Sequence, residues 1–394
     1  MQIFDRISYS MWKIGVLIER QRAYGRSICS GISQFARQAG NLSLKMLEWD
    51  DLSRPQGLSQ FDGFIARILN EKMARRFMRT NKPVVDIFHE REWAGISSVD
   101  QHANSVAQLA VRHLIEHKFI RFGFCGFNGR HYSDARRDAF CHCLSLNHFN
   151  CQVYDSPSSL LNDFDNLIIR RERMSFNADN ATLLHWIKSL TKPVAVFCAH
   201  DLRAYQLIEL CNQHGIRVPE EIAVLGVDND ELICNFVTPT LSSIDLNGET
   251  IGSTAAELIV RHLENPDLKP TFITVRPSKI VERESTSIYP VDPPWLSDAL
   301  VYIRRNVAQR ISADDVFKHL NRSHTLVSNA FRKTLGTSVQ KEIQNSRLVE
   351  AQRLIRTTTL PLREIATLSG FASLQYFSSS FSTEFGKPPS AFRH

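Results

Sequence analysis

The stretch VAVFCAHDLRAYQLIELCNQHGIRVPEEIAVLGVDND, residues 194–230, holds the pattern that decides the fold. It opens with the apolar run VAVFC and returns to a second apolar run, AVLGV, from Ala223. Runs that are apolar on both faces are typical of strands in a parallel sheet covered by helices. Between the runs we expect a helix that begins at Leu202 and is capped by His200-Asp201.

The same alternation of strand and helix recurs over about 280 residues. A helix is indicated between Ala103 and His117, where apolar side chains recur on one side. Further strands are predicted at KIGVLI from Lys13, SLKML from Ser43, GFI from Gly63, PVVDIF from Pro83, SSV from Ser97 and RFGFC from Arg121. The sequence therefore predicts an α/β unit of parallel sheets, in two lobes.

Composition narrows the class of protein. Hydrophobic residues make up 43% and charged residues 22% of 394, which excludes a disordered or fibrous chain. Apolar runs stay below the ~18 residues of a membrane span, and the N-terminus has no secretion signal, so we expect a cytoplasmic protein without a membrane partner. The eight cysteines predict reduced, mostly buried thiols, and the spacing in CHCLSLNHFNC (141–151) fits no zinc site.

Charge is unevenly distributed along the chain. Residues 295–394 hold 14 Lys and Arg against 7 Asp and Glu, whereas residues 1–294 hold 33 against 34. A near-neutral part joined to a small basic part suggests one region that meets an uncharged ligand and another that meets phosphate. The proline-rich stretch TSIYPVDPPWL separates them, because it suits neither a helix nor a sheet. The predicted boundaries are 13–285, a linker at 286–296, and 297–394.

The basic part contains an internal repeat with an offset of 50 residues. Ser323, Phe331 and Gly336 recur as Ser373, Phe381 and Gly386. Each copy predicts a helix with a Ser N-cap, a buried apolar stripe and a Gly at the C-terminal turn. Further helices are predicted at 312–320, 339–356 and 362–369. The sequence thus predicts an all-α unit with two helix-turn-helix motifs, joined by a helix of about 18 residues that spans ~27 Å.

Two recognition helices at that separation suit successive major grooves of double-stranded DNA. Amide and hydroxyl side chains suit base edges, and arginines such as Arg332 and Arg353 suit phosphates. Arg347 suits either a phosphate or a lock between helices. The residues predicted to face DNA are Thr325, Ser328, Asn329, Arg332, Leu374, Gln375, Ser378 and Ser379.

Polar side chains in the α/β part follow predicted strand ends. In parallel sheets, ligands sit beyond the carboxyl ends of the strands, which is where Asp228 falls after AVLGV. Arg136 is expected at the start of a helix after RFGFCGFNG. Carboxylate, amide and guanidinium groups beside aromatic rings suit a sugar or another polyol. The predicted ligand contacts are Arg22, Tyr24, Phe88, Phe127, Tyr132, Arg136, Asp228 and Asn229.

The terminal hundred residues resemble the DNA-binding domain of the AraC/XylS family, most clearly in IATLSGFASLQYFSSSFSTEFGKPPSAFR, residues 365–393. The first motif departs from the family pattern. Phe317 stands where a small residue is usual, and Asn321-Arg322 replaces a glycine and an apolar residue at the turn. Asn tolerates a left-handed turn, whereas Arg322 cannot be buried without a partner.

Residues 13–285 resemble the effector-binding core of the LacI/GalR family, which has a periplasmic-binding-protein-like fold. The resemblance rests on residues 196–230, on VRHLIEHKFIRFGFCG and on IVERESTS. In that family the residues that match Arg136 and Asp228 contact a sugar. A LacI-like core followed by an AraC-type domain is the arrangement of xylose operon regulators, so the resemblance implies a pentose effector, D-xylose first. We also expect an activator and a homodimer. RNA polymerase is a further possible partner.

Two other classes of protein stay open. One is a cytoplasmic carbohydrate-processing enzyme with a tail that docks on nucleic acid, and the other is an architectural DNA-binding protein. The glycines of GFCGFNG do not follow the dinucleotide-binding spacing, and no motif of a hydrolase or a metalloprotease is present. We therefore expect no catalysis, no cofactor and no metal.

Overall fold

The computed structural model describes residues 11–53, 57–157 and 179–393. The chain divides into two compact units. The first runs to Ile115 and resumes over Ile120–Thr286, and the second holds Glu116–Phe119 together with the residues from Ser287 onward. The first helix of the second unit starts at Trp295, inside the predicted linker. His394, the last residue of the predicted terminal domain, lies outside the described residues.

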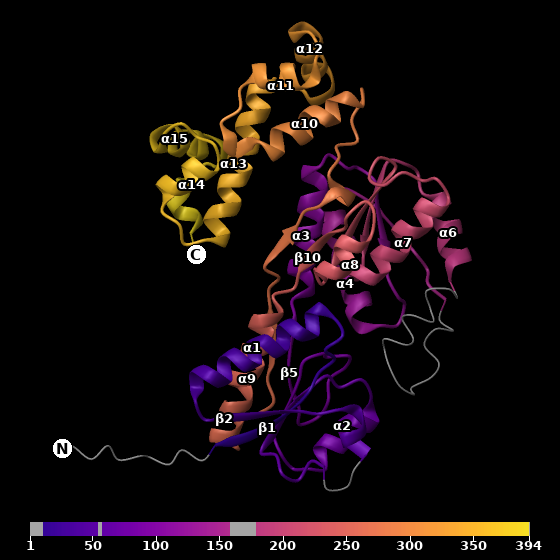
Figure 1. Ribbon diagram of the computed structural model, residues 1–394, viewed down its shortest axis with the longest axis vertical. Coiled ribbons are helices and arrows are strands. Elements are labelled where there is room, and N and C mark those ends of the chain that lie inside the picture. The colour runs from indigo at the N-terminus through magenta and orange to yellow at the C-terminus, as the bar shows by residue number, and fades with distance from the viewer. Residues whose placement is uncertain (1–10, 54–56, 158–178, 394) are drawn as a thin grey trace, which may run out of the picture. The chain divides into compact units, whose positions relative to one another are not determined.

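The first unit contains two six-stranded sheets, here called lobe 1 and lobe 2 (Figure 1). Lobe 1 is wholly parallel, with the order β11-β5-β4-β3-β1-β2, and lobe 2 has the order β12-β10-β9-β8-β6-β7 with only β12 antiparallel. The predicted α/β class with two parallel-sheet lobes is confirmed. The strands are β1 (Trp12–Leu17), β2 (Leu42–Met46), β3 (Gly63–Ala66), β4 (Val84–Asp86), β5 (Ser97–Gln101), β6 (Phe122–Cys125), β7 (Cys151–Val153), β8 (Val194–Cys198), β9 (Ile222–Val227), β10 (Ser242–Asp245), β11 (Phe272–Val275) and β12 (Lys279–Val281).

The chain passes between the lobes three times: after β5, after β10 and after β11. Helices α1 and α9 lie side by side on lobe 1 (Figure 1), where a Cβ atom on Gly252 would come within 2.0 Å of the Ile28 carbonyl oxygen. Glycine therefore permits this close packing. The helices of this unit are α1 (Ala23–Ala39), α2 (Glu71–Met78), α3 (Ala103–Glu116), α4 (His131–Leu146), α6 (Asn180–Ser189), α7 (Asp201–Gln213), α8 (Glu231–Phe236) and α9 (Gly248–Glu264).

All eight predicted strands are present, and four short strands escaped prediction. These are β7, β10, β11 and β12, which have three or four residues each. Strands β7, β11 and β12 lie at sheet edges and are partly exposed, so they lack the continuous apolar run that marks a central strand. Strand β10 begins with two serines that are buried and hydrogen-bonded.

The second unit is helical throughout its described residues, as predicted. One apolar core contains Val327 and Phe331, the other contains Phe377 and Phe381, and α13 contributes to both. The predicted Ser N-caps and Gly C-caps are confirmed, and Ser312 and Asp315 form a capping box at the start of the helix that follows. The helices are α10 (Trp295–Arg305), α11 (Ala313–Leu320), α12 (His324–Leu335), α13 (Val339–Thr357), α14 (Leu362–Leu368) and α15 (Leu374–Phe385). Among the described residues, no helix combines the length and the apolar character needed to span a membrane.

Candidate functional site

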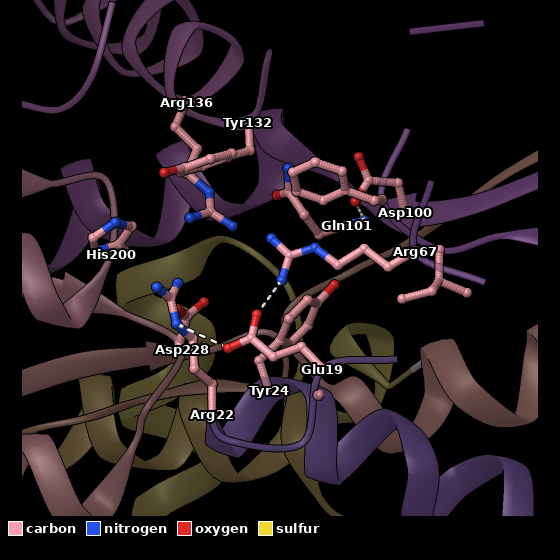
Figure 2. Close-up of a pocket in the computed structure, with 13 residues that line it drawn as sticks. Glu19, Arg22, Tyr24, Arg67, Asp100, Gln101, Tyr132, Arg136, His200 and Asp228 are labelled. Atoms are coloured by element: carbon pink, nitrogen blue, oxygen red, sulfur yellow. Dashed lines mark hydrogen bonds and ion pairs between the residues drawn. The ribbon is translucent and has the colours of Figure 1, made fainter. Parts of the chain in front are cut away.

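A pocket lies between the two lobes of the first unit, where the carboxyl ends of their strands meet (Figure 2). The empty space inside the pocket and its open mouth amounts to about 560 Å³. Lobe 1 provides Glu19, Arg22, Tyr24, Gly25, Arg67, Ile87, Phe88, Asp100 and Gln101. Lobe 2 provides Tyr132, Arg136, His200 and Asp228.

Strand ends position most of the polar groups. Glu19 follows β1, Arg67 follows β3, and Asp100 lies at the end of β5. On the lobe 2 side, His200 follows β8 and Asp228 follows β9. Asp228 has a φ of 106°, in a backbone region that a side chain with a Cβ rarely adopts, and its N–H donates to the carbonyl oxygen of Ile244.

Three arginines reach the pocket, and two of them share one carboxylate. Glu19 lies 2.7 Å from an Nη of Arg67 and 3.4 Å from the Nε of Arg22 (Figure 2). The guanidinium of Arg67 also lies over the Phe88 ring, 4.1 Å from its centroid. Arg136 approaches from the opposite lobe, donates to the Ala199 carbonyl oxygen and lies 5.5 Å from the centroid of Tyr132.

Burial changes the protonation of the pocket. Desolvation raises the pKa of Asp228 to about 6, although the nearby Arg136 and Arg22 oppose the shift. It likewise raises the pKa of Asp100 to about 7, against the attraction of Arg136. Burial lowers the pKa of His200 well below its usual value, so this imidazole is neutral at pH 7. Its Nδ1 accepts from the Arg203 N–H at the start of α7, which leaves Nε2 to carry the proton.

Some buried polar atoms of the pocket lack a hydrogen-bond partner within the described residues. They are the Oε1 of Gln101 and the Nε atoms of Arg67 and Arg136. An acceptor and two donors that are withdrawn from water and lack protein partners favour a ligand that offers both donors and acceptors. Hydroxyl groups do so, and Tyr24, Phe88 and Tyr132 add ring surface for an apolar face.

Six of the eight predicted ligand contacts line this pocket: Arg22, Tyr24, Phe88, Tyr132, Arg136 and Asp228. Phe127 and Asn229 are not among the lining residues. The Phe127 ring packs against the buried guanidinium of Arg203, 4.5 Å away, and the Asn229 side-chain oxygen accepts from Arg283. The expectation that Arg136 starts a helix is wrong. The helix begins five residues earlier, at His131, and Arg136 lies within it.

Five polar residues that line the pocket are not among the predicted ligand contacts: Glu19, Arg67, Asp100, Gln101 and His200. All five lie at or just after the carboxyl end of a predicted strand, so the rule that placed Asp228 there also applies to them. His200 was assigned only to a helix cap. It does cap α7, and it also faces the pocket.

The predicted DNA-facing residues lie on the second helix of each helix-turn-helix motif. On α12, Thr325, Asn329 and Arg332 are exposed and Ser328 is half-buried. On α15, Leu374, Gln375 and Ser379 are exposed and Ser378 is half-buried. Two large side chains that the sequence analysis did not select, Leu326 and Tyr376, are also exposed on these helices.

The atypical turn of the first motif forms without burying the charge of Arg322. Asn321 takes the left-handed conformation, with a φ of 49°, as its side chain permits. Arg322 is exposed and lies over the Trp295 ring, 5.0 Å from its centroid, which satisfies the expectation that it is not buried alone. Arg347 donates to the Ile311 carbonyl oxygen at 2.8 Å, so it joins α13 to the segment that precedes α11.

Two family models match the chain. Residues 111–286 match the model of a periplasmic binding protein-like domain, and residues 316–394 match the model of a helix-turn-helix domain. The first match lies in the unit that holds the pocket, and the second covers both candidate recognition helices.

Similar proteins match nearly the whole chain. The xylose operon regulatory protein of Haemophilus influenzae is 26% identical over 97% of this chain and 98% of its own length. The protein of the same description from Escherichia coli is 25% identical over 97% and 96%.

Solved structures share the fold. A structure of the xylose-binding transcription activator XylR has a TM-score of 0.58 at 24% identity, covering 97% of each chain. A LacI family regulator from Enterococcus faecium with bound ribose covers 69% of this chain with a TM-score of 0.54 at 18% identity. The chain therefore has the two-part architecture of XylR-like regulators, a periplasmic-binding-protein-like domain followed by an AraC-type helix-turn-helix domain, and its full-length relatives are transcription regulators rather than enzymes.

Proposed function

We propose that this chain is a cytoplasmic transcription regulator whose binding to an operator is controlled by a small sugar in the pocket between its lobes. One observation carries the proposal: a buried pocket of carboxylates, guanidinium groups and aromatic rings belongs to the same chain as two helix-turn-helix motifs. The pocket supplies a ligand site and the motifs supply a DNA site. The proposal includes a sugar-binding domain that ends at residue 285 and a DNA-binding domain that begins at residue 297.

The chemistry of the pocket favours a neutral polyol. Asp228 and Asp100 accept from hydroxyl groups, and Arg136 and Arg67 donate to them. An aromatic ring such as Tyr132 covers the apolar face of a sugar ring. Arg22, Tyr24 and Phe88 complete the set of predicted ligand contacts that line the pocket. Phe127 and Asn229 would act from behind it.

D-Xylose is the first candidate effector. The relatives that cover nearly the whole chain are described as xylose operon regulatory proteins. Their identity to this chain is about one residue in four, so the screen below includes other pentoses and hexoses.

Control of DNA binding requires that the ligand bind one form of the protein more tightly than another. A sugar that contacts both lobes binds the closed form more tightly, because only that form brings Asp228 and Tyr24 to one molecule. In a homodimer, closure would change how two pairs of recognition helices meet the operator. For an activator, the closed form binds DNA more tightly and presents the surface that meets RNA polymerase.

The DNA contacts are proposed on α12 and α15. Asn329 and Gln375 suit adenine, the hydroxyls of Thr325, Ser328, Ser378 and Ser379 suit several bases, and Leu374 suits the thymine methyl group. Arg332 suits a phosphate beside the first recognition helix. Tyr376 adds an exposed ring to this face.

A thermal-shift screen of the full chain against D-xylose, L-arabinose, D-ribose, D-glucose and D-galactose tests the proposal. At a concentration of 100 times its Kd, an effector stabilises the protein by about 2.7 kcal/mol, which is a readily measured shift. Arg136→Ala is the negative control, since it removes a lining cation. A shift with a sugar other than xylose corrects only the choice of effector. The absence of a shift with every sugar would contradict the proposed ligand class.

A further inference from the structure

Asp230 caps two helices that belong to different lobes. Its Oδ1 accepts from the Leu232 N–H at 3.3 Å, which caps α8 in lobe 2. Its Oδ2 accepts from the Ala23 N–H at 2.9 Å, at the first residue of α1 in lobe 1. The Asp230 side chain is 7% exposed, and its N–H is held by Asp201 at 2.8 Å.

Helix α1 depends on this contact because its own sequence supplies no cap. Its N-cap residue, Arg22, makes no side-chain cap hydrogen bond, and its first turn contains no acidic residue. The first N–H groups of a helix need acceptors, and a carboxylate there also meets the positive end of the helix dipole. Arg26 on the same helix lies 3.9 Å from the Asp230 carboxylate and adds a second attraction.

The same contact is coupled to the pocket through the chain on both sides. On lobe 1, Arg22 and Tyr24, which flank Ala23, line the pocket. On lobe 2, Asp228 lines the pocket two residues before Asp230. A ligand held between Tyr24 and Asp228 therefore holds the partners of the Asp230 contact together.

A second contact between the lobes lies at another point of the cleft. The rings of Phe88 and Tyr132 are 6.3 Å apart, and those of His89 and His131 are 5.6 Å apart. Phe88 and His89 follow β4 of lobe 1, whereas His131 and Tyr132 begin α4 of lobe 2. Side-chain contacts thus join the two lobes both at Asp230 and at this pair of rings.

We propose that Asp230 is a positioning residue that holds the cleft closed by capping α1 across the lobes. Because the contact joins the two lobes, opening of the cleft would break it, so it adds to the closure free energy that a ligand uses. This inference rests on the proposed function for its effect on a sugar, but the contact itself is measurable without one.

The test uses the full chain and amide hydrogen exchange followed by mass spectrometry. In Asp230→Ser the shorter hydroxyl side chain still caps α8, since Ser is a good N-cap, but does not reach Ala23. We expect faster exchange in a peptide covering residues 20–27, with unchanged exchange in residues 231–237. Asp230→Asn, which keeps the size and one acceptor oxygen, gives a second variant with the same expected direction. Glu231→Gln is the matched control, because Glu231 is an exposed carboxylate one residue away.

The effect on a ligand is measured by stopped flow with the sugar that gives the largest thermal shift. Loss of one helix cap predicts dissociation about fivefold faster in Asp230→Ser, with association nearly unchanged. Unchanged exchange at residues 20–27, or equal changes in Glu231→Gln, would overturn the proposal. If no sugar binds the wild-type protein, the proposed effector class fails, while the exchange experiment still decides whether Asp230 joins the lobes.

Discussion

The pocket and the recognition helices place polar groups in opposite surroundings. In the pocket, Arg136 is 4% exposed and Asp100 is 7% exposed, and both face other charges. On α15, Leu374 is 41% exposed and Tyr376 is 48% exposed, beside uncharged hydroxyl and amide groups. The polar groups of the pocket are thus charged and withdrawn from water. The side chains of the candidate DNA face are mostly uncharged and remain in contact with water in the free protein.

This difference sets the size of the effect that a substitution has. Removal of a buried charge leaves its partner without compensation, which costs several times more than the loss of an exposed contact. Charged side chains on the surface are also screened by salt, and buried ones much less. The following predictions test the contrast between the two regions, starting with the largest effect.

Asp228→Ala should abolish binding of the sugar and leave the affinity for DNA without sugar unchanged. The substitution removes an acceptor for hydroxyls and the carboxylate that faces Arg136 and Arg22. Isothermal titration calorimetry measures the first quantity and fluorescence anisotropy with a DNA duplex the second. Asp138→Ala, at an exposed carboxylate of the same lobe, is the control. Normal sugar binding by Asp228→Ala would show that the pocket is assigned wrongly.

Salt should separate the two regions next. With about five phosphate contacts, the affinity for DNA should fall by about 10²- to 10³-fold between 50 and 200 mM salt, because each contact releases a counterion. The affinity for the sugar should change less than twofold over the same range, because the ligand is neutral and the pocket charges are buried. A flat response for DNA would count against the basic unit as the DNA-binding part.

Gln375→Ala should relax base preference at one position of the operator by about 1 to 3 kcal/mol. The amide suits adenine, and the alanine methyl group offers no hydrogen bond to a base edge. Selection from a random duplex library, performed with both proteins, measures the preference at every position. Gln340→Ala on α13 is the control, since Gln340 is also an exposed glutamine. A preference that is lost equally at all positions would mean that Gln375 contributes only to general affinity.

The smallest effect is expected from pH. Asp228 has a pKa raised to about 6 and Asp100 one raised to about 7, so both carboxyls gain protons as pH falls through this range. Hydroxyl groups donate to the ionised form of a carboxyl group. The affinity for the sugar should therefore decrease as pH is lowered, by about tenfold from Asp228 alone between pH 7 and pH 5. Asp228→Asn should lose that part of the pH dependence, and an affinity that rises toward pH 5 would contradict the assignment.

The sequence predicted the two candidate recognition helices more completely than the lining of the pocket, for a physical reason. The face of a helix follows from spacing within one segment, so the repeat of Ser323 and Phe331 at Ser373 and Phe381 was enough to place α12 and α15. The pocket depends on pairs that are distant in sequence, such as Glu19 and Arg67. Nothing local distinguishes such a buried ion pair from two surface charges at strand ends.

The central claim is that occupation of the pocket changes the affinity for DNA. It is tested by the affinity for a selected operator with and without saturating sugar, and by the affinity for the sugar with and without saturating operator. The account predicts the same factor in both measurements, because coupling between two sites is reciprocal, and a factor of one in Asp228→Ala. An affinity for DNA that does not respond to bound sugar, or that responds equally in Asp228→Ala, would contradict it.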